Sequence, residues 1–264
     1  MNLNLKGKTA LITGSTSGIG FTTAKILLKE GLTVYINGRT KGSVENALVN
    51  LKDEVVDAQV FGLITDFSNS NQVKNLLEKL DEIDILVNNV GIYSSKSFFE
   101  TSIETWQEQL EVNLMSCVSL SKHYLKGMLE RNWGRVLFIS SECAYLVPSD
   151  MISYSATKAA MHAVSRGIAN VTKGTDVTSN VVVPGSTLTE GAKAFLTEKA
   201  NAKNTSIYDV EKDFFNNDRP SSLLKRFTST DEVASTITYL CSPLSSATNG
   251  AVIKVDGGSS GGIL

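Results

Sequence analysis

TALITGSTSGIG, residues 9–20, joins a short apolar run to a glycine-rich turn, and this stretch decides the fold. The apolar run predicts a buried strand over Thr9–Thr13, and a helical pattern follows from about Ile19 to Glu30. Glycines let the backbone turn sharply and approach a pyrophosphate, to which the helix N-terminus offers free N–H groups. The turn, spaced GxxxGxG, therefore indicates a dinucleotide site, although a plain structural turn explains it equally well on its own.

Patterns typical of strands and helices alternate along the rest of the chain. Strands are expected at 33–37, 59–64, 83–87, 135–139, 180–183 and 251–255, and helices at about 44–51, 69–80, 104–131, 152–171 and 230–240. Such alternation predicts parallel β-α-β units with right-handed crossovers and helices on both faces of the sheet. No repeat, linker or break in composition divides the chain, so we expect one α/β domain over 1–264.

Three of the expected helices have recognisable N-terminal caps. Ser68 precedes one of them, and the spacings Thr101–Glu104 and Ser229–Glu232 fit capping boxes at two others. In a capping box the first side chain accepts from a backbone N–H and the acidic side chain returns the bond. These residues are therefore expected to mark where the helices begin.

Residues 188–222 interrupt the alternation between the strand at 180–183 and the last helix. The stretch is polar and charged, and it follows the carboxyl end of a strand, where α/β sheets bind their ligands. An interruption of this length in a compact domain is usually functional or mobile. We expect a substrate-binding lid; the alternative is a surface insertion with one or two short helices of its own.

Two further motifs carry groups suited to acid–base chemistry. Tyr154 and Lys158 share a face of the helix at 152–171, so the ammonium of Lys158 is expected to lie beside the phenol and lower its pKa. Ser140 and Ser141 follow the strand at 135–139, at the edge of the sheet that contacts ligands. Each motif alone also has an ordinary structural explanation, an amphipathic helix or a hydrogen-bonded turn.

Taken together, the motifs resemble those of the short-chain dehydrogenase/reductase family, in its classical type. They are the turn at 13–20, Asn88-Asn89-Val90-Gly91, Asn113, Ser141, Tyr154-x-x-x-Lys158, Pro184-Gly185 and Val255-Asp256-Gly257-Gly258, in the family's order and spacing. The likeness covers nearly the whole chain, and Val90 departs from it, since alanine is usual there. It implies a single-domain, doubly wound Rossmann fold with a seven-stranded parallel sheet, and hydride transfer between NAD(P) and an alcohol or carbonyl.

The resemblance also implies roles for four side chains. Tyr154 would exchange a proton with the substrate oxygen, and Lys158 would lower the pKa of Tyr154 and hold the nicotinamide ribose. Ser141 would orient the substrate carbonyl, and Asn113 would complete a proton relay through Lys158. The residues expected at the cofactor are Gly14, Ser15, Ser17, Gly18, Ile19, Gly20, Asn37, Arg39, Asp66, Phe67, Asn88, Asn89, Gly91, Tyr154, Lys158, Pro184, Gly185, Thr187 and Thr189.

The end of the second strand bears on the choice between NADP and NAD. Sites specific for NAD usually place a carboxylate there for the ribose 2′-hydroxyl, and residues 36–39 read Ile-Asn-Gly-Arg without one. Arg39 offers a guanidinium that fits a 2′-phosphate, and Lys41 lies nearby in the chain. We therefore expect a preference for NADP, with NAD as the second choice; the alternative leaves Arg39 on a solvated helix surface.

Composition narrows the remaining classes of protein. Lys and Arg number 25 against 27 Asp and Glu, so the net charge of −2 offers no basic field for nucleic acid or anionic lipid. His123 and His162 lie far apart, and Cys117, Cys143 and Cys241 form no CxxC pair, which disfavours a metal site or a disulfide framework. Neither a spanning apolar run nor a signal-peptide pattern is found, and reduced thiols favour a cytoplasmic protein.

These observations predict an NADP-preferring carbonyl reductase or alcohol dehydrogenase that acts on a small molecule. Its substrate pocket is expected to be partly apolar, lined by Ile92, Tyr93, Cys143, Tyr145 and Met151 together with the lid. A 3-oxoacyl-[acyl-carrier-protein] reductase is the alternative within the family, although Thr175 stands where a second arginine besides Arg131 is expected for an acidic carrier. A non-catalytic NADP-binding sensor is the alternative of another class.

The two long helices have more apolar and small residues than packing on one sheet requires. The residues in question are Leu114, Cys117, Val118, Leu120, Leu125, Ala159, Ala160, Ala163 and Ile168. A second apolar stripe on a helix needs a second partner. Because these helices pair across two-fold axes in the family, we expect a homodimer or homotetramer, with the homotetramer preferred.

Overall fold

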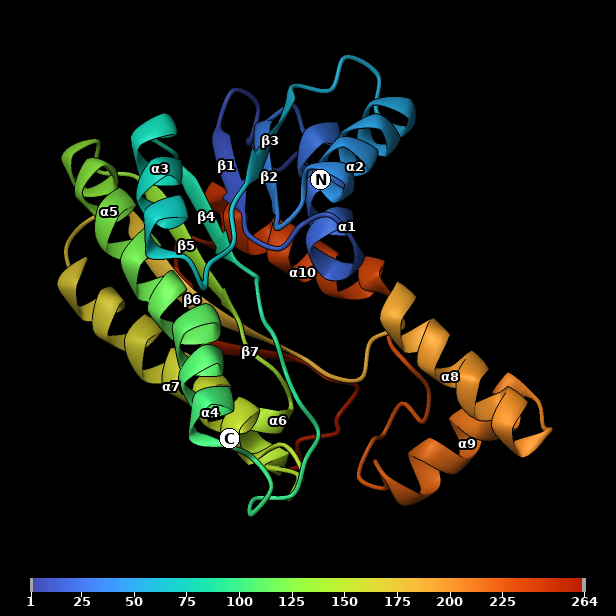
Figure 1. The fold of residues 1–264 in the computed structure, drawn as a ribbon. Coiled ribbons are helices and arrows are strands. Elements are labelled where there is room, and N and C mark those ends of the chain that lie inside the picture. Colours follow the sequence, from blue (N-terminus) through green and yellow to red (C-terminus); the bar gives the residue numbers. More distant parts are fainter. Residues whose placement is uncertain (1, 263–264) are drawn as a thin grey trace.

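The stretch at 9–20 forms a strand, a turn and a helix, as its pattern predicts. Strand β1 (Thr9–Ile12) leads through the glycine-rich turn into helix α1 (Gly18–Lys29) in the computed structural model, which describes residues 2–262. The other strands are β2 (Thr33–Gly38), β3 (Val60–Ile64), β4 (Ile85–Asn88), β5 (Gly134–Ile139), β6 (Val177–Pro184) and β7 (Val252–Val255). In the described residues these strands form one parallel sheet, which confirms the predicted seven-stranded Rossmann-type fold (Figure 1).

The order of the strands reverses at the middle of the sheet. The order is β3-β2-β1-β4-β5-β6-β7, so the chain builds outward from β1 in one direction and from β4 in the other. Open α/β sheets bind their ligands at the carboxyl ends of the strands next to such a reversal. The fold therefore places a binding site at the ends of β1 and β4.

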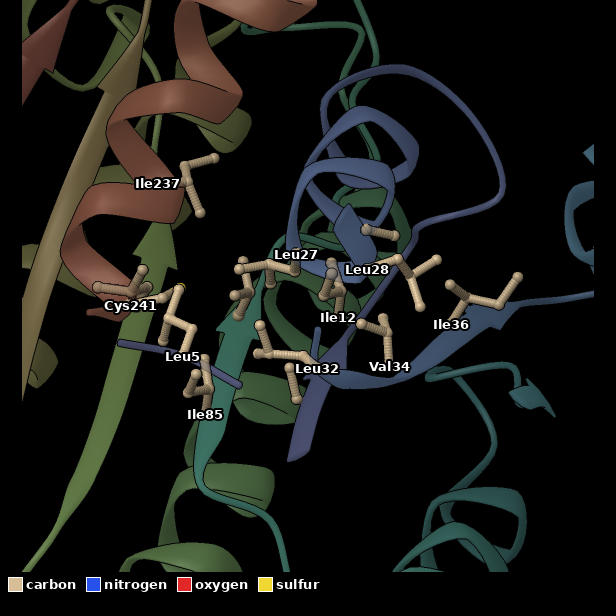
Figure 2. Close-up of a cluster of buried hydrophobic side chains, with 14 of the residues drawn as sticks. Leu5, Ile12, Leu27, Leu28, Leu32, Val34, Ile36, Ile85, Ile237 and Cys241 are labelled. Carbon is tan, nitrogen blue, oxygen red and sulfur yellow. The ribbon is translucent and has the colours of Figure 1, made fainter. Parts of the chain in front are cut away.

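Helices cover both faces of this sheet (Figure 1). One face packs against α1, α2 (Lys41–Glu54) and α10 (Thr230–Cys241), and the other against α3 (Ser70–Lys79), α5 (Ser116–Glu130) and α7 (Ile152–Val171). Alternate residues of β1 serve the two cores, since Ile12 belongs to the first and Leu11 to the second. Figure 2 shows the first core, where Leu27 of α1 and Ile237 of α10 lie with side chains from the strands.

Two of the three predicted caps are displaced by one residue. Ser102, not Thr101, caps α4 (Ile103–Gln109), and Asn69, not Ser68, caps α3. Neighbouring residues of similar capping strength make such a shift easy, because Ser, Thr and Asn all accept well from a first-turn N–H. The third prediction is confirmed, since Ser229 forms a complete capping box at α10.

The helix predicted at 104–131 is not a continuous α-helix. It consists of α4, a wider π-helical turn η1 (Leu110–Met115) and α5. Such π-turns are rare inside helices and frequent at functional sites. Asn113 lies in η1, so the widened turn carries one of the residues expected to be catalytic.

Two helices fill the 188–222 stretch, α8 (Glu190–Lys203) and α9 (Ile207–Asn217). They share a small apolar cluster that is separate from the two sheet cores and includes Leu196, Ala200, Val210, Phe215 and Phe227. Figure 1 shows the pair standing out from the layers of the sheet, connected to the end of β6. Regular structure in this stretch fits a lid and a surface insertion alike.

The outward faces of the long helices differ in part from the prediction. Cys117 and Leu120 of α5 are fully buried against the sheet, so they do not contribute to an outer stripe. Leu110 and Met115 of η1 are exposed instead, at 38% and 47%, and Ala159 of α7 is exposed as predicted. An apolar outer surface therefore lies on η1 and α7.

None of the helices within residues 2–262 has the length and apolar character needed to cross a membrane.

Candidate active site

A cleft of about 350 Å³ opens at the carboxyl ends of β1 to β4, next to the reversal of strand order. Of the residues expected at the cofactor, Gly14, Ser17, Asn37, Arg39, Asp66, Phe67, Asn89 and Gly91 line it. Its lining also includes Thr16, Gly38, Thr65, Ser68, Val90, Ile92, Glu108 and Val112. The expected residues outside this lining are Ser15, Gly18, Ile19, Gly20, Asn88, Tyr154, Lys158, Pro184, Gly185, Thr187 and Thr189.

The glycine-rich turn is held against β2 by hydrogen bonds. The N–H of Ser15 donates to the carbonyl oxygen of Asn37 (2.9 Å), and the hydroxyl of Ser15 accepts from the N–H of Asn37 (2.9 Å). Oδ1 of Asn37 accepts in turn from the N–H of Gly14 (3.0 Å). Ser15 is fully buried, so it supports the turn from beneath rather than lining the cleft.

Two glycines of the turn leave no room for a side chain. Gly14 has a φ of 59°, and a Cβ there would lie 2.9 Å from Cα of Val90. A Cβ on Gly20 would lie 2.6 Å from Nδ2 of Asn89 and 2.7 Å from the carbonyl oxygen of Gly14. Ser17, the cap residue of α1, makes no side-chain capping bond. The turn thus packs closely on the residues that follow β4, and the N-terminus of α1 has no cap from its own Ser17.

Asn88, the last residue of β4, and Asn89, which follows it, have different surroundings. Asn89 donates from Nδ2 to the carbonyl oxygens of Thr13 (2.9 Å) and Gly14 (2.8 Å), which ties β4 to the turn. Asn88 is fully buried, donates to Oγ of Ser121 (3.4 Å), and leaves Oδ1 without a hydrogen-bond partner among the described residues. Asn88 therefore lies beneath the cleft, on the side of α5.

Arg39 and Asp66 lie where β2 and β3 end, at one part of the cleft. Ser68 donates to Oδ1 of Asp66 from its N–H (2.9 Å) and its hydroxyl (2.8 Å). These bonds hold the pKa of Asp66 below its usual value, and the cation of Arg39 contributes in the same direction. This end of the cleft therefore offers an exposed cation and an anionic hydrogen-bond acceptor together.

Asn113, Tyr154 and Lys158 come together beside Gly91, another residue of the cleft. A Cβ on Gly91 would lie 3.1 Å from Nζ of Lys158 and 3.7 Å from Oδ1 of Asn113. Lys158 is buried, donates from Nζ to the carbonyl oxygen of Ile139 (2.9 Å), and lies 5.6 Å from the centre of the Tyr154 ring. The geometry thus assembles three of the four residues expected to be catalytic.

Asn113 holds three segments of this site in place. Its Oδ1 accepts from the N–H of Ile92 (2.8 Å), and its Nδ2 donates to the carbonyl oxygen of Ile92 (2.9 Å) and to Oγ1 of Thr157 (3.0 Å). The side chain is fully buried. These bonds join η1 to the loop after β4 and to α7, which explains a polar residue inside a helix.

The protonation equilibria differ from the expectation drawn from the sequence. Burial raises the pKa of Tyr154 well above its ordinary value, and a hydrogen bond with Ser141 acts against that rise. Burial also lowers the pKa of Lys158 to about 8. The expectation that Lys158 lowers the pKa of Tyr154 is therefore not met in this structure, where burial dominates both pKa values and Lys158 is not among the groups that affect the pKa of Tyr154.

Thr189 lies against the glycine-rich turn, whereas Thr187 does not. A Cβ on Gly18 would lie 3.3 Å from Cγ2 of Thr189, and Oε2 of Glu190 accepts from the N–H of Gly18 (3.0 Å). The hydroxyl of Thr187 lies 3.0 Å from that of Thr228, in the segment before α10. The start of α8 therefore packs on the N-terminus of α1.

The sequence and the fold match proteins of one family. A model of the short chain dehydrogenase family matches residues 8–200. The chain belongs to this family. The uncharacterized oxidoreductase YvaG of Bacillus subtilis (strain 168) is 42% identical over 258 residues, 98% of each chain. The 3-oxoacyl-[acyl-carrier-protein] reductase FabG of Aquifex aeolicus (strain VF5) is 33% identical over 98% of this chain and 99% of its own.

A solved structure supports the same assignment. The L-sorbose reductase of Gluconobacter frateurii, complexed with NADPH and L-sorbose, is 28% identical over 100% of both chains, with a TM-score of 0.93. This short-chain dehydrogenase is therefore an oxidoreductase by family and shares the whole fold of a protein solved with a nicotinamide cofactor.

The short-chain dehydrogenase also brings residues to the site that the sequence did not identify. Thr16 and Thr65 line the cleft. Each lies next in the chain to a residue expected at the cofactor, Ser17 and Asp66, and this adjacency could have identified both. Glu190 contacts the turn directly after Thr189. Glu142 and Arg219 form an ion pair next to Ser141 in the chain. No sequence pattern links those two residues, which lie 77 positions apart.

Proposed function

We propose that this short-chain dehydrogenase transfers a hydride between nicotinamide C4 of NADP and a small carbonyl or secondary alcohol, with Tyr154 as the acid/base. The observation that carries the proposal is the convergence of Asn113, Tyr154 and Lys158 beside Gly91, a residue that lines the same cleft as Arg39. Acid–base groups and an anion-binding surface thus share one site, as hydride transfer to a polarised carbonyl requires.

The cleft fits a dinucleotide by the chemistry of its donors. Gly14 and Gly20 exclude side chains from the turn, and the N-terminus of α1 presents backbone N–H groups without a side-chain cap at Ser17. Such a helix start favours an anion through its N–H groups and its dipole, and the carboxylate of Glu190 accepts from the N–H of Gly18 there. When bound there, the nicotinamide supplies the hydride chemistry, and the protein supplies orientation and proton transfer.

Tyr154 is suited to donate a proton during carbonyl reduction. Its raised pKa keeps the phenol protonated at neutral pH, which is the form that a general acid needs. Ser141 lies close enough to the phenol to oppose the rise in its pKa, so we assign both hydroxyls to the same substrate oxygen. We assign to the buried ammonium of Lys158 the ribose hydroxyls of the cofactor, and to Asn113 the support of the loop that contains Gly91.

The preference for NADP over NAD rests on Arg39. The end of β2 has no carboxylate, and Arg39 is exposed where it lines the cleft. A guanidinium matches a phosphate with two parallel hydrogen bonds, whereas a carboxylate would repel it. The similar L-sorbose reductase was solved with NADPH, which supports the same choice.

A 3-oxoacyl-[acyl-carrier-protein] reductase is the second candidate, because FabG proteins are among the relatives. That activity would use Arg131 to contact an acidic carrier. In the structure Nη1 of Arg131 lies 3.2 Å from the carboxylate of Glu82, and Nη2 donates to the carbonyl oxygen of Ile83 (2.8 Å). The guanidinium is thus already engaged, and we rank the small-molecule substrate first. A non-catalytic sensor ranks last, since it has no need of Asn113, Tyr154 and Lys158 assembled at one place.

Two parts of the proposal concern larger units. We assign 188–222 as a lid over the substrate, because α8 begins on the glycine-rich turn and the stretch has its own small core. We also assign a homotetramer built through the apolar outer surface of η1 and α7, where Leu110, Met115 and Ala159 are exposed. Bracing α7 in this way would fix the helix that carries Tyr154 and Lys158.

Turnover of defined probes tests the proposal. The protein is mixed with NADPH or NADH and with ethyl acetoacetate, L-sorbose or cyclohexanone, and the absorbance of the reduced nicotinamide is followed. Tyr154→Phe is expected to lose at least about 100-fold in turnover while NADPH affinity stays within a few-fold. Binding of NADPH without turnover of any probe would favour the sensor, and wild-type turnover in the Phe variant would remove Tyr154 from the mechanism.

A further inference from the structure

Glu142 and Arg219 form a buried ion pair that the reaction scheme above does not use. Nε of Arg219 lies 2.8 Å from Oε1 of Glu142, and the two side chains are 16% and 4% exposed. Ser186 donates its hydroxyl to the same Oε1 (2.8 Å). Oε2 is buried and has no hydrogen-bond partner among the described residues. Burying a carboxylate is costly unless a cation and hydrogen bonds accompany it, so Arg219 supports Glu142 in this position.

The pair joins three segments that meet at the site. Glu142 directly follows Ser141 at the end of β5, and its N–H donates to the carbonyl oxygen of Pro184 at the end of β6 (2.8 Å). Ser186 belongs to the turn after β6. Arg219 follows α9, so its contact with Glu142 fastens the end of the 188–222 stretch to the turn that contains Ser141.

The charge of Glu142 acts on Tyr154. The groups that face its phenol are Cys143 of α6 (Cys143–Leu146), Tyr93 of the loop after β4, Glu142, Ser141 and, on its own helix, Lys158. An anion disfavours the phenolate and a cation favours it, so Glu142 opposes the release of the proton. Arg219 offsets this effect by neutralising Glu142. Its charge also reaches α6, where it acts against the rise that burial causes in the pKa of Cys143.

We propose that Arg219 is a positioning residue for the reaction: through Glu142 it holds the Ser141 turn and balances the charge beside Tyr154. The proposal rests on the function given above, since it takes Tyr154 as the acid/base. Without Arg219, the Glu142 carboxylate faces the phenol unbalanced, and the protonated form of Tyr154 persists to higher pH. Without the charge of Glu142, the Arg219 cation acts alone and the phenol loses its proton at lower pH.

A double-mutant cycle tests the charge balance. The pH profile of kcat is measured with NADPH and the best of the three ketone probes for the wild type, Arg219→Gln, Glu142→Gln and the double variant. We expect the midpoint to move up by roughly one pH unit in Arg219→Gln and down in Glu142→Gln. The double variant should return close to the wild type. A purely structural contact would lower stability without shifts of opposite sign.

The design remains decisive where a single variant does not fold. Arg219→Gln leaves an unpaired buried charge, which is strongly destabilising, whereas the double variant does not. The downward shift in Glu142→Gln and its cancellation in the double variant then provide the test. Arg226→Gln is the matched control, because Arg226 pairs with Glu232 at the same 2.8 Å on the exposed start of α10 and should leave the profile unchanged.

Two kinds of failure are separable in this experiment. Profiles that coincide with the wild type in both single variants, or that move in the same direction, overturn the role of Arg219. A double variant no closer to the wild type than the singles does so as well. Absence of turnover in the wild type with every probe would instead refute the proposed function.

Discussion

Arg39 is exposed at the edge of the cleft, close enough to Asp66 for its charge to affect that carboxyl group. An aspartate in its place would repel a 2′-phosphate and accept from a 2′-hydroxyl. Arg39→Asp should therefore reduce kcat/KM at least about tenfold more with NADPH than with NADH, since charge-assisted hydrogen bonds are lost. Steady-state kinetics with both cofactors measure the ratio.

A neighbouring cation provides the control for this change. Lys41 lies two residues further on and forms an exposed pair with Glu45 (3.7 Å). Lys41→Asp should change the ratio less than Arg39→Asp. An unaltered ratio in Arg39→Asp would show that Arg39 does not meet the 2′-phosphate.

Lys158 is buried in a way that costs stability. Its pKa of about 8 in the folded protein lies below the ordinary 10.5, so folding below pH 8 must bury an ammonium. That cost is relieved as the pH rises from about 8 toward 10.5. Lys158→Met should therefore raise Tm at pH 7 and lose turnover, with an upper limit of about 3 kcal/mol in stability before the bond to Ile139 is deducted.

The pH dependence of this gain distinguishes its cause. The difference in Tm between Lys158→Met and the wild type should shrink toward pH 10, because both chains then bury an uncharged group. Calorimetry at several pH values measures it. A difference that does not vary with pH would mean that packing, not desolvation of the ammonium, separates the two proteins.

The residues of the site were partly predictable from their local spacing. Tyr154 and Lys158 are four residues apart on one helix, and the structure keeps them together. The direction of their pKa shifts was not predictable, because the burial of both groups depends on packing from η1 and the β4 loop. The contact between Glu142 and Arg219 depends on a stretch of chain whose path no spacing rule describes.

Among the elements, α8 makes the most informative contact. Its first residue, Glu190, places a carboxylate on the N–H of Gly18, where the proposed pyrophosphate site begins. Anions that share a helix start compete, so cofactor binding should displace Glu190 and move α8. Hydrogen exchange across 188–222 should therefore be fast in the free protein and slow with NADPH and substrate present.

A matched pair of variants identifies the cause of that change. Glu190→Gln removes the competing charge and should lower the Kd for NADPH several-fold. Glu198→Gln, on the same helix and exposed without an ion pair among the described residues, should not. Equal exchange in the free and bound protein would identify the helices as a static surface insertion.

Element types were easier to predict than element details. Strand and helix positions followed from alternation of apolar residues, which the parallel sheet buries on both faces. The π-turn η1 has no sequence signal, because it arises where Asn113 must reach both Ile92 and Thr157. Cys117 and Leu120, which follow η1 in α5, face the core although the pattern had placed them outward.

For the whole molecule we expect a homotetramer. Met115 of η1 is 47% exposed and lies on the outer surface assigned to assembly. Met115→Glu should lower the mass seen by size-exclusion chromatography with light scattering, and turnover should fall with it because α7 loses its brace. Val56→Glu, at an 88% exposed position after α2, is the control. A wild-type protein that is monomeric and active would refute the assembly.

The reversal of strand order between β1 and β4 separates the residues expected to set cofactor preference from those expected to contact the substrate. Arg39 and Asp66 follow β2 and β3 on one side of it, whereas Ser141 follows β5 and Tyr154 lies in α7 on the other. A gene exchange between relatives with its junction near Val90 would thus transfer cofactor preference without substrate preference. The two traits can diverge on separate branches of a family tree, so the cofactor of a relative is a poor guide to its substrate.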